Sequence, residues 1–408
     1  MPTHNLPRPG MPATSIRRMP WSLLVAAAAA LLGCGGGGAS ADAPVAPPAT
    51  QPWVWSLPQG FTPPAVPADN PMNAAKVELG RRLFHDVRLS GNGTQSCASC
   101  HAQASAFTDS RALSRGSTGE VHPRNALPLA NVAYSTTLNW ANPTVTTLEQ
   151  QMQAPLFNTQ PVEMGVNDGN RAEVLARLRS DADYPPRFTA AFAGEADALS
   201  WDNVIKAIAA FERTLVSAGS RYDQFQAGTA SLTAQEQRGM QLFFGDRALC
   251  ARCHGSPNFN DQFATAAAPG AAPAFHNTGL FNIGGTGAYP EPNRGVYELT
   301  RIAQDMGRFR AASLRNIELT APYMHDGSIP TLEAVLDFYA GGGRDVGNGL
   351  YAGDGRLNPY KDPLIGQIRL EAQDKADIVA FLKTLTDTAF VTDPRFADPF
   401  ASPTRKAP

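Results

Sequence analysis

Two short stretches of the sequence place two cysteines and a histidine at the spacing C-x-x-C-H. They are Cys97, Cys100 and His101 in "CASCH", and Cys250, Cys253 and His254 in "CARCH". This spacing is typical of c-type haem attachment, in which both thiols bond to the haem and the histidine binds the iron. A zinc site would need four ligands, and a redox dithiol would not need the histidine in both copies. The pattern therefore predicts two covalent haems c, each with one histidine on its iron.

The residues before the two motifs are also alike. The stretch "GRRLF" precedes the first motif and "GMQLF" precedes the second. The matching positions are Gly80, Leu83 and Phe84 in the first, and Gly239, Leu242 and Phe243 in the second. Each haem motif therefore follows a short helix with the same packing residues, and two related units stand in tandem.

Helical patterns account for most of the remaining regular structure. Asn70 as N-cap and Pro71 at the first helical position predict a helix that runs to Phe84. Apolar residues recur at intervals of three and four over residues 201–216, and a capping box of Thr233 and Glu236 opens the second unit. Further helices are expected in "TLEQQM", "NRAEVLARLRSD", "TLEAVLDFY" and "DKADIVAFLKTL".

The sequence contains no convincing β-sheet pattern, and long Gly-, Pro- and Ala-containing loops cover residues 107–142 and 264–295. Loops of that length usually carry function. We therefore predict a mostly α fold of two tandem cytochrome c-like domains, residues 70–218 and 219–408, with the loops around the haems.

The first 69 residues predict export. Arg17 and Arg18 precede an apolar run over residues 21–32, which is too short to span a membrane but suits a signal peptide. The run ends in "LLGC", which resembles the bacterial lipobox. We expect a lipoprotein signal peptide over residues 1–34, ending at a lipidated Cys34. The alternative is an ordinary signal peptide with an incidental cysteine.

A Gly-, Ala- and Pro-rich stretch over residues 35–69 suits a flexible tether after the lipid. The expected location is the periplasm. Gly35 lacks the acidic character associated with inner-membrane retention, so the outer membrane is favoured over the inner. The formal net charge is −2 and no basic run follows the signal, which argues against a nucleic-acid partner.

The order of motifs over residues 72–388 resembles the bacterial dihaem cytochrome c peroxidase and MauG superfamily. Besides the haem motifs, the resemblance rests on "HPRNALPLANVAY", "LNWANP", "QPVEMG", "FHNTGL" and "APYMHDGSIPTLEAVLDFY". The chain looks most like the MbnH branch, whose members are encoded near copper-protein partners and oxidise a partner tryptophan to kynurenine.

The resemblance implies that the first haem reacts with hydrogen peroxide. Ser117 stands where classical peroxidases carry a histidine that can bind the first iron, so we expect this haem to be five-coordinate. The alternative is that the neighbouring His122 binds the iron. Glu163 in "QPVEMG" matches the distal glutamate of the superfamily, which would move a proton on peroxide as a general acid and base.

The resemblance also assigns roles around the second haem. Tyr339 matches the second ligand of that iron, and an anionic oxygen donor favours stored oxidising equivalents. Trp140 in "LNWANP" matches a tryptophan that relays electrons between the haems. Asn125, Thr320 and Pro322 match an inter-haem calcium site built from oxygen ligands. Haem-propionate contacts and structural roles stay equally open for His276, Arg315 and His325.

The expected function is that of a lipid-anchored periplasmic oxidase. It would use hydrogen peroxide to form a high-valent dihaem state that oxidises a tryptophan of a copper-binding protein. An alternative is a plain peroxidase that takes electrons from a small cytochrome or cupredoxin. A dihaem protein that only transfers electrons would have two protein ligands on each iron, and Ser117 argues against it.

Overall fold

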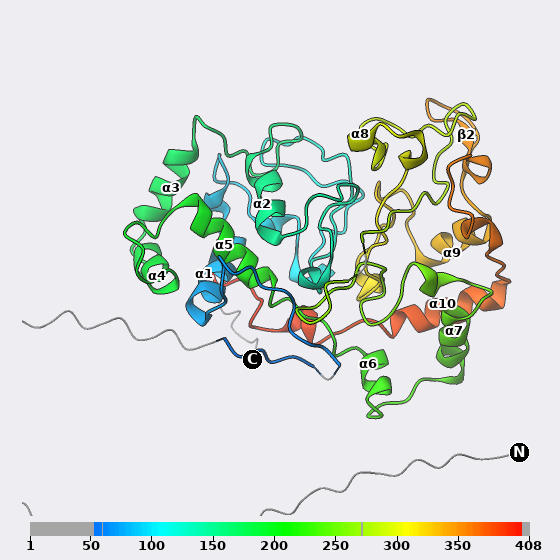
Figure 1. Cartoon of the computed structure of the whole chain (residues 1–408), viewed down its shortest axis with the longest axis horizontal. Helices are drawn as coiled ribbons and strands as arrows, with labels where there is room; N and C mark the ends of the chain where they lie inside the picture. Colours follow the sequence, from blue (N-terminus) through cyan, green and yellow to red (C-terminus); the bar gives the residue numbers. More distant parts are fainter. Residues whose placement is uncertain (1–52, 59, 271, 402–408) are drawn as a thin grey trace, which may run out of the picture. The chain divides into compact units, whose positions relative to one another are not determined.

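The computed structural model describes residues 53–58, 60–270 and 272–401, which belong to one compact unit (Figure 1). The predicted signal peptide, Cys34 and the first part of the predicted tether lie outside the described residues. Within them, no helix combines the length and the apolar character needed to cross a membrane.

The regular structure of the described residues is mostly helical, which confirms the predicted fold class. The helices are α1 Ala74–His85, α2 Leu148–Phe157, α3 Arg171–Arg179, α4 Tyr184–Ala191, α5 Trp201–Glu212, α6 Arg221–Gln226, α7 Ala234–Phe244, α8 Tyr297–Thr300, α9 Leu332–Ala340 and α10 Ala372–Lys383. In these parts of the chain, the only paired strands are the antiparallel β1 Asp345–Val346 and β2 Gly353–Asp354. Long loops around the helices carry most of the residues predicted to act.

The two sequence units form the same helix crossing. In the first, α1 packs on α5, and a Cβ atom at Gly80 would overlap the backbone oxygen of Ala207. In the second, α7 packs on α10, and a Cβ atom at Gly239 would overlap the backbone oxygen of Asp377. Only glycine allows the helices to approach this closely, which explains why the residue recurs at both positions.

Aromatic pairs complete both crossings. The ring centroids of Phe84 and Phe211 lie 5.2 Å apart in the first unit, and those of Phe243 and Phe381 lie 5.2 Å apart in the second. All four side chains are fully buried. Each haem motif follows directly from a helix held by such a core, so the cores set the position of the cysteines and histidines.

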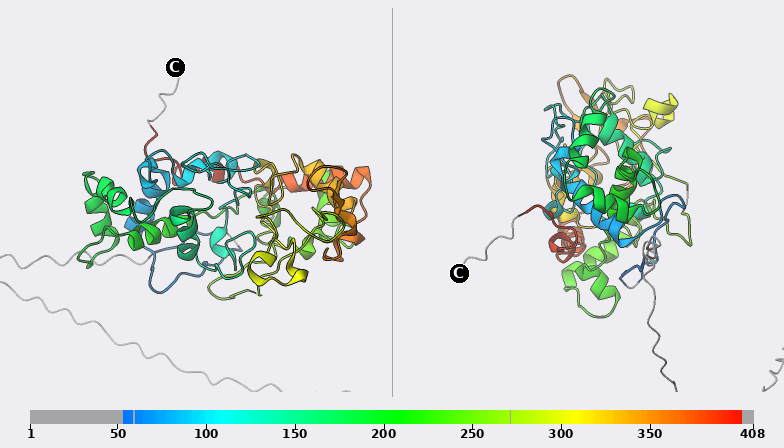
Figure 2. Two further views of the ribbon diagram at one scale, coloured as in Figure 1. Left: turned by 90° about the horizontal axis from the view of Figure 1, so that it is seen from above. Right: turned by 90° about the vertical axis from the view of Figure 1, so that its left-hand side faces the viewer.

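The end of the chain returns to the first core. Phe390 and Phe396, which follow α10, pack among the buried side chains of the first unit. The side-chain nitrogen of Gln103 donates to the backbone oxygens of Phe390 at 3.2 Å and Asp393 at 2.9 Å. Figure 2 shows this red segment beside the blue α1. The limits 70–218 and 219–408 stay a prediction.

The first helix begins later than predicted. Its N-cap is Asn73, whose side-chain oxygen accepts from the Lys76 amide at 2.7 Å. Asn70 is instead buried, and its side-chain nitrogen donates to Glu149 at 2.6 Å. The N-cap–proline pattern was wrong here because a tertiary contact uses the Asn70 side chain.

Other boundaries also differ. The helix predicted over residues 201–216 ends at Glu212. The capping box is confirmed, since the Thr233 and Glu236 side chains each accept from the other's amide, at 3.3 and 2.8 Å. The short helices α4, α6 and α8 were missed, and α4 begins with two prolines in its first turn.

Candidate functional site

Both motif histidines are oriented by backbone oxygens. The Nδ1 atom of His101 lies 2.8 Å from the oxygen of Phe107, and that of His254 lies 3.1 Å from the oxygen of Phe259. A proton on Nδ1 satisfies this contact and leaves Nε2 free to bind a metal. Burial lowers the pKa of both histidines, so the neutral, metal-binding form is favoured.

Each motif borders a cavity. The first, with a volume of about 710 Å³, is lined by Cys100 and His101. The second, with a volume of about 210 Å³, is lined by Cys250, Cys253 and His254. The four motif cysteines form no disulfide. The thiols are therefore available for the thioether bonds that the motif predicts.

The buried Arg310, which lines both cavities, suits an acidic ligand. Arg310 lines both of them and is 8% exposed. Its guanidinium donates to the oxygen of Thr137 at 2.6 Å and to the hydroxyl of Ser135 at 3.1 Å, while Nε has no partner. Burial lowers the pKa of Arg310 to about 10. A buried cation without a carboxylate partner fits an acidic group such as a haem propionate. The residues present thus fit the predicted haems.

Sequence reasoning missed Arg310. The residue lies in "GRFRAAS", within a stretch that helps to carry the family resemblance, but nothing local distinguishes it from the two arginines nearby. Its burial depends on Thr137 and Ser135, which are far away in the sequence. Only the tertiary structure reveals it.

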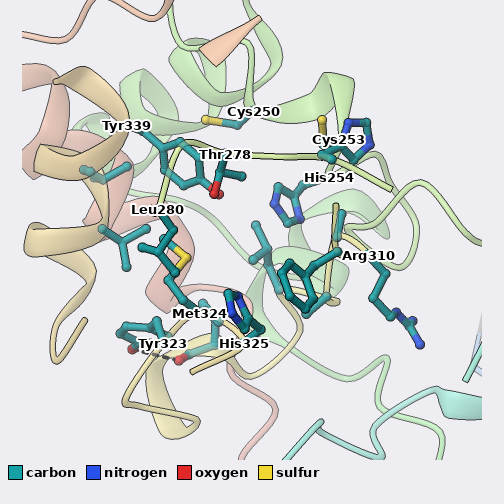
Figure 3. Close-up of a pocket in the computed structure, with 18 of the residues that line it drawn as sticks. Cys250, Cys253, His254, Thr278, Leu280, Arg310, Tyr323, Met324, His325 and Tyr339 are labelled. Carbon is teal, nitrogen blue, oxygen red and sulfur yellow. Dashed lines mark hydrogen bonds between the residues drawn. The ribbon is translucent and has the colours of Figure 1, made fainter. Parts of the chain in front are cut away.

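Among His276, Arg315 and His325, only His325 has a buried side-chain nitrogen without a hydrogen-bond partner. It lines the second cavity and is 5% exposed, and its Nε2 has no partner (Figure 3). Burial lowers its pKa to about 4, so it is neutral at pH 7. His276 instead lies between the carboxylates of Asp261 and Asp362, at 2.7 and 2.8 Å.

Arg315 has a structural environment. Its guanidinium donates to both carboxylate oxygens of Asp223, at 2.8 and 2.9 Å, and to the backbone oxygen of Pro257 at 2.9 Å. The side chain is 1% exposed and does not line either cavity. Its hydrogen bonds are thus satisfied by protein groups alone.

The structure brings Glu163 and His122 together in the first cavity. Their side chains approach to 3.3 Å between Oε1 and Nε2, and both are partly exposed. Ser117 does not line this cavity, and its amide donates to the backbone oxygen of Glu163 at 2.7 Å. The two loops can approach this closely because residue 116 is glycine. A Cβ atom at Gly116 would overlap the backbone oxygen of Val162.

Trp140 lies between the two cavities and lines both. Its indole Nε1 donates to the backbone oxygen of Asn125 at 2.8 Å. Tyr339, from α9, lines the second cavity together with His254 (Figure 3). Burial raises the pKa of Tyr339 above its usual range. The arrangement places one oxidisable ring between the sites and one phenol beside the second motif.

The three predicted calcium ligands border the same cavity. Asn125, Thr320 and Pro322 all line the second cavity. The side-chain nitrogen of Asn125 donates to the backbone oxygen of Arg111 at 2.7 Å, which leaves its amide oxygen as the atom for a cation. Oxygen donors of this kind suit calcium, so the residues fit the predicted ion.

Similarity to known proteins agrees with this geometry. A family model described as di-haem cytochrome c peroxidase matches residues 74–231, and a RoxA-like, cytochrome c-like model matches residues 308–340. The chain is 36% identical over 359 residues to cytochrome-c peroxidase IdrP1 of Denitromonas iodatirespirans, covering 81% of this chain and 87% of that protein.

Two further relatives extend the similarity. Methylamine utilization protein MauG of Methylorubrum extorquens is 32% identical over 331 residues, covering 81% of this chain and 83% of that protein. The crystal structure of a MauG-like protein associated with microbial copper homeostasis is 54% identical, with a TM-score of 0.84, covering 86% of this chain and 100% of that one.

Proposed function

The chain belongs to the di-haem cytochrome c peroxidase family, and from this membership we propose that it uses hydrogen peroxide to oxidise a side chain of a protein partner. It is a cytochrome c peroxidase/MauG-type oxidoreductase, and the family implies two c-type haems. The proposed target is a tryptophan of a periplasmic copper-binding protein, which would become kynurenine. The similarity to a MauG-like protein associated with copper homeostasis supports this choice.

The pairing of Glu163 with His122 in the first cavity carries the proposal. When bound, the two haems supply the redox chemistry and hold the oxidising equivalents of peroxide. The Glu163 carboxylate removes a proton from one oxygen of hydrogen peroxide and returns it to the other oxygen, which departs. His122, at 3.3 Å, positions that carboxylate in the cavity. Ser117 stands where classical peroxidases carry an iron-binding histidine, and it does not line this cavity. Both facts agree with an open site for peroxide.

Trp140 and Tyr339 connect this reaction to the second site. Trp140 borders both cavities and would pass single electrons between them, and Tyr339, which lines the second cavity, would supply an oxygen ligand to the iron held there. Calcium held by Asn125, Thr320 and Pro322 would hold their two chain segments together at the second cavity. We also propose that lipid on Cys34 anchors the enzyme in the periplasm, with the outer membrane favoured.

The decisive experiment gives the holoenzyme hydrogen peroxide and a copper-binding protein encoded beside it. Peptide mass spectrometry of the partner should show kynurenine in place of one tryptophan with wild-type enzyme, and far less of it after the same reaction time with Glu163→Gln. The 36% identity to a cytochrome-c peroxidase favours a second candidate, which is peroxide reduction with electrons from a small cytochrome or cupredoxin. Rapid turnover with such a donor and an unmodified partner would establish that candidate instead.

A further inference from the structure

A continuous file of aromatic rings leads away from Trp140. The ring centroids of Trp140 and His325 lie 6.5 Å apart in an edge-on arrangement. The His325 ring stacks on Phe309 at 3.7 Å with an interplanar angle of 9°. These residues lie at the second cavity, so the file starts where the two sites meet.

The same file continues to the surface. Tyr289 lies 6.4 Å from both His325 and Phe309, between ring centroids. Phe281 follows at 5.5 Å from Tyr289, and Tyr351 at 5.9 Å from Phe281. The intervening rings are buried, whereas Tyr351 is 39% exposed. The file thus ends at a solvent-accessible phenol in the turn between β1 and β2.

The members of the file differ in how readily they give up an electron. Phenylalanine is hard to oxidise, and the Arg344 guanidinium lies 4.4 Å from the centroid of Phe281, which further disfavours positive charge there. Phe281 therefore acts as a bridge. Tyr289 donates its hydroxyl proton to the amide oxygen of Asn277 at 2.8 Å, and an amide oxygen is too weak a base to keep that proton.

Tyr351 differs from Tyr289 because water reaches it. An oxidised tyrosine is a strong acid, and an exposed phenol can pass its proton to solvent. The radical that results is neutral and comes to rest at the surface. Trp140, Tyr289 and Tyr351 are thus the oxidisable members of the file, and only Tyr351 can release its proton to water.

We propose that Tyr351 is the surface site through which oxidising equivalents reach a protein partner. This inference rests on the proposed function and names where the partner must dock. In each step Tyr351 loses one electron inward along the file and one proton to water. An aromatic side chain of the partner then returns one electron and one proton. Two such steps supply the two electrons that, with two protons, reduce one peroxide to two waters.

The test combines spectroscopy with radical mapping on the holoenzyme. Peroxide is added without partner in the presence of a nitroso spin trap, and labelled peptides are identified by mass spectrometry. The expected result is a label on Tyr351 in the wild type. Tyr351→Phe should lose this label and slow partner oxidation by about tenfold or more. Tyr297→Phe is the matched control, since Tyr297 is partly exposed and belongs to no pair in the file.

The outcomes separate this inference from the function on which it rests. If peroxide leaves the haem absorbance of the wild type unchanged, the proposed function fails and the inference fails with it. If the absorbance changes but the label lies elsewhere, or Tyr351→Phe oxidises the partner at the wild-type rate, the exit through Tyr351 is refuted alone.

Discussion

The indole of Trp140 donates to the backbone oxygen of Asn125 at 2.8 Å. The backbone N–H of Asn125 in turn donates to the backbone oxygen of His325 at 2.8 Å. Trp140, between the two cavities, is therefore joined to Asn125, a predicted calcium ligand, and through Asn125 to the segment that carries His325. The proposed electron relay at Trp140 and the contact between these two segments thus depend on the same hydrogen bonds.

Trp140→Phe should separate these two roles. The smaller ring cannot donate to Asn125 and is much harder to oxidise. We expect partner oxidation to fall by about tenfold or more, and the free energy of unfolding to fall by about 1–3 kcal/mol from the unsatisfied backbone oxygen. Single-turnover assays and denaturant unfolding measure the two effects. Loss of stability with normal partner oxidation would assign Trp140 a structural role only.

Glu163→Gln keeps the shape of the side chain but removes its proton exchange. The reaction of the resting enzyme with peroxide should slow by about 10²-fold or more, as followed by stopped-flow absorbance. Glu173→Gln is a suitable control because Glu173 is an exposed residue of α3. An unchanged rate in Glu163→Gln would remove the carboxylate from the peroxide step.

Tyr339→Phe should change the second iron and not the first. Electron paramagnetic resonance of the resting ferric wild type should show one high-spin and one low-spin iron. Removing the phenol oxygen should convert the low-spin signal to high spin, because that iron loses one ligand. Two low-spin signals in the wild type would contradict both the open first site and the role of Ser117.

Glu212 predicts a pH dependence of stability. The side chain is buried on α5, and burial raises its pKa from 4.5 to about 8. Between these values the folded protein keeps a proton that the unfolded chain releases. This group's stabilising contribution is therefore complete below pH 4.5, and it is lost as the pH rises toward 8, at about 1.4 kcal/mol per pH unit at most. Guanidinium unfolding of Glu212→Gln should lack this component. Parallel curves for wild type and variant would refute it.

The glycines at the helix crossings should tolerate no side chain. Gly80→Ala and Gly239→Ala each force a methyl group against a backbone oxygen of the facing helix, so each should cost about 1–3 kcal/mol or more of unfolding free energy. Gly366→Ala is the control, because a Cβ atom there meets nothing within 4 Å. Equal stability of all three variants would mean that the helices separate freely.

The features predicted from the sequence are those that depend on residues close together in the chain. The C-x-x-C-H spacing and the 3.6-residue periodicity of α5, α9 and α10 need no knowledge of the rest of the chain. The repeat of Gly80 at Gly239 was visible as well, although its cause, the close helix approach, was not.

What escaped prediction depends on contacts between distant segments. His122 and Glu163 meet because Gly116 lets two loops touch, and no spacing rule encodes that approach. The same is true of Arg310, which is buried without a carboxylate partner. The predicted start of the first helix was wrong because the Asn70 side chain donates to Glu149 of α2 instead of capping α1.

The return of the C-terminal segment to the first core has a consequence for biogenesis. The side chain of Arg81 donates to the backbone oxygen of Ala397 at 2.8 Å, and Phe390 and Phe396 complete the core beside α1. A ribosome makes these residues after both haem motifs, so the core beside α1 is incomplete until the segment that follows α10 has been made. Until then, Cys97, which packs against this core, would stay open to haem attachment, and a nonsense codon directly after α10 would leave the core of the first unit incomplete.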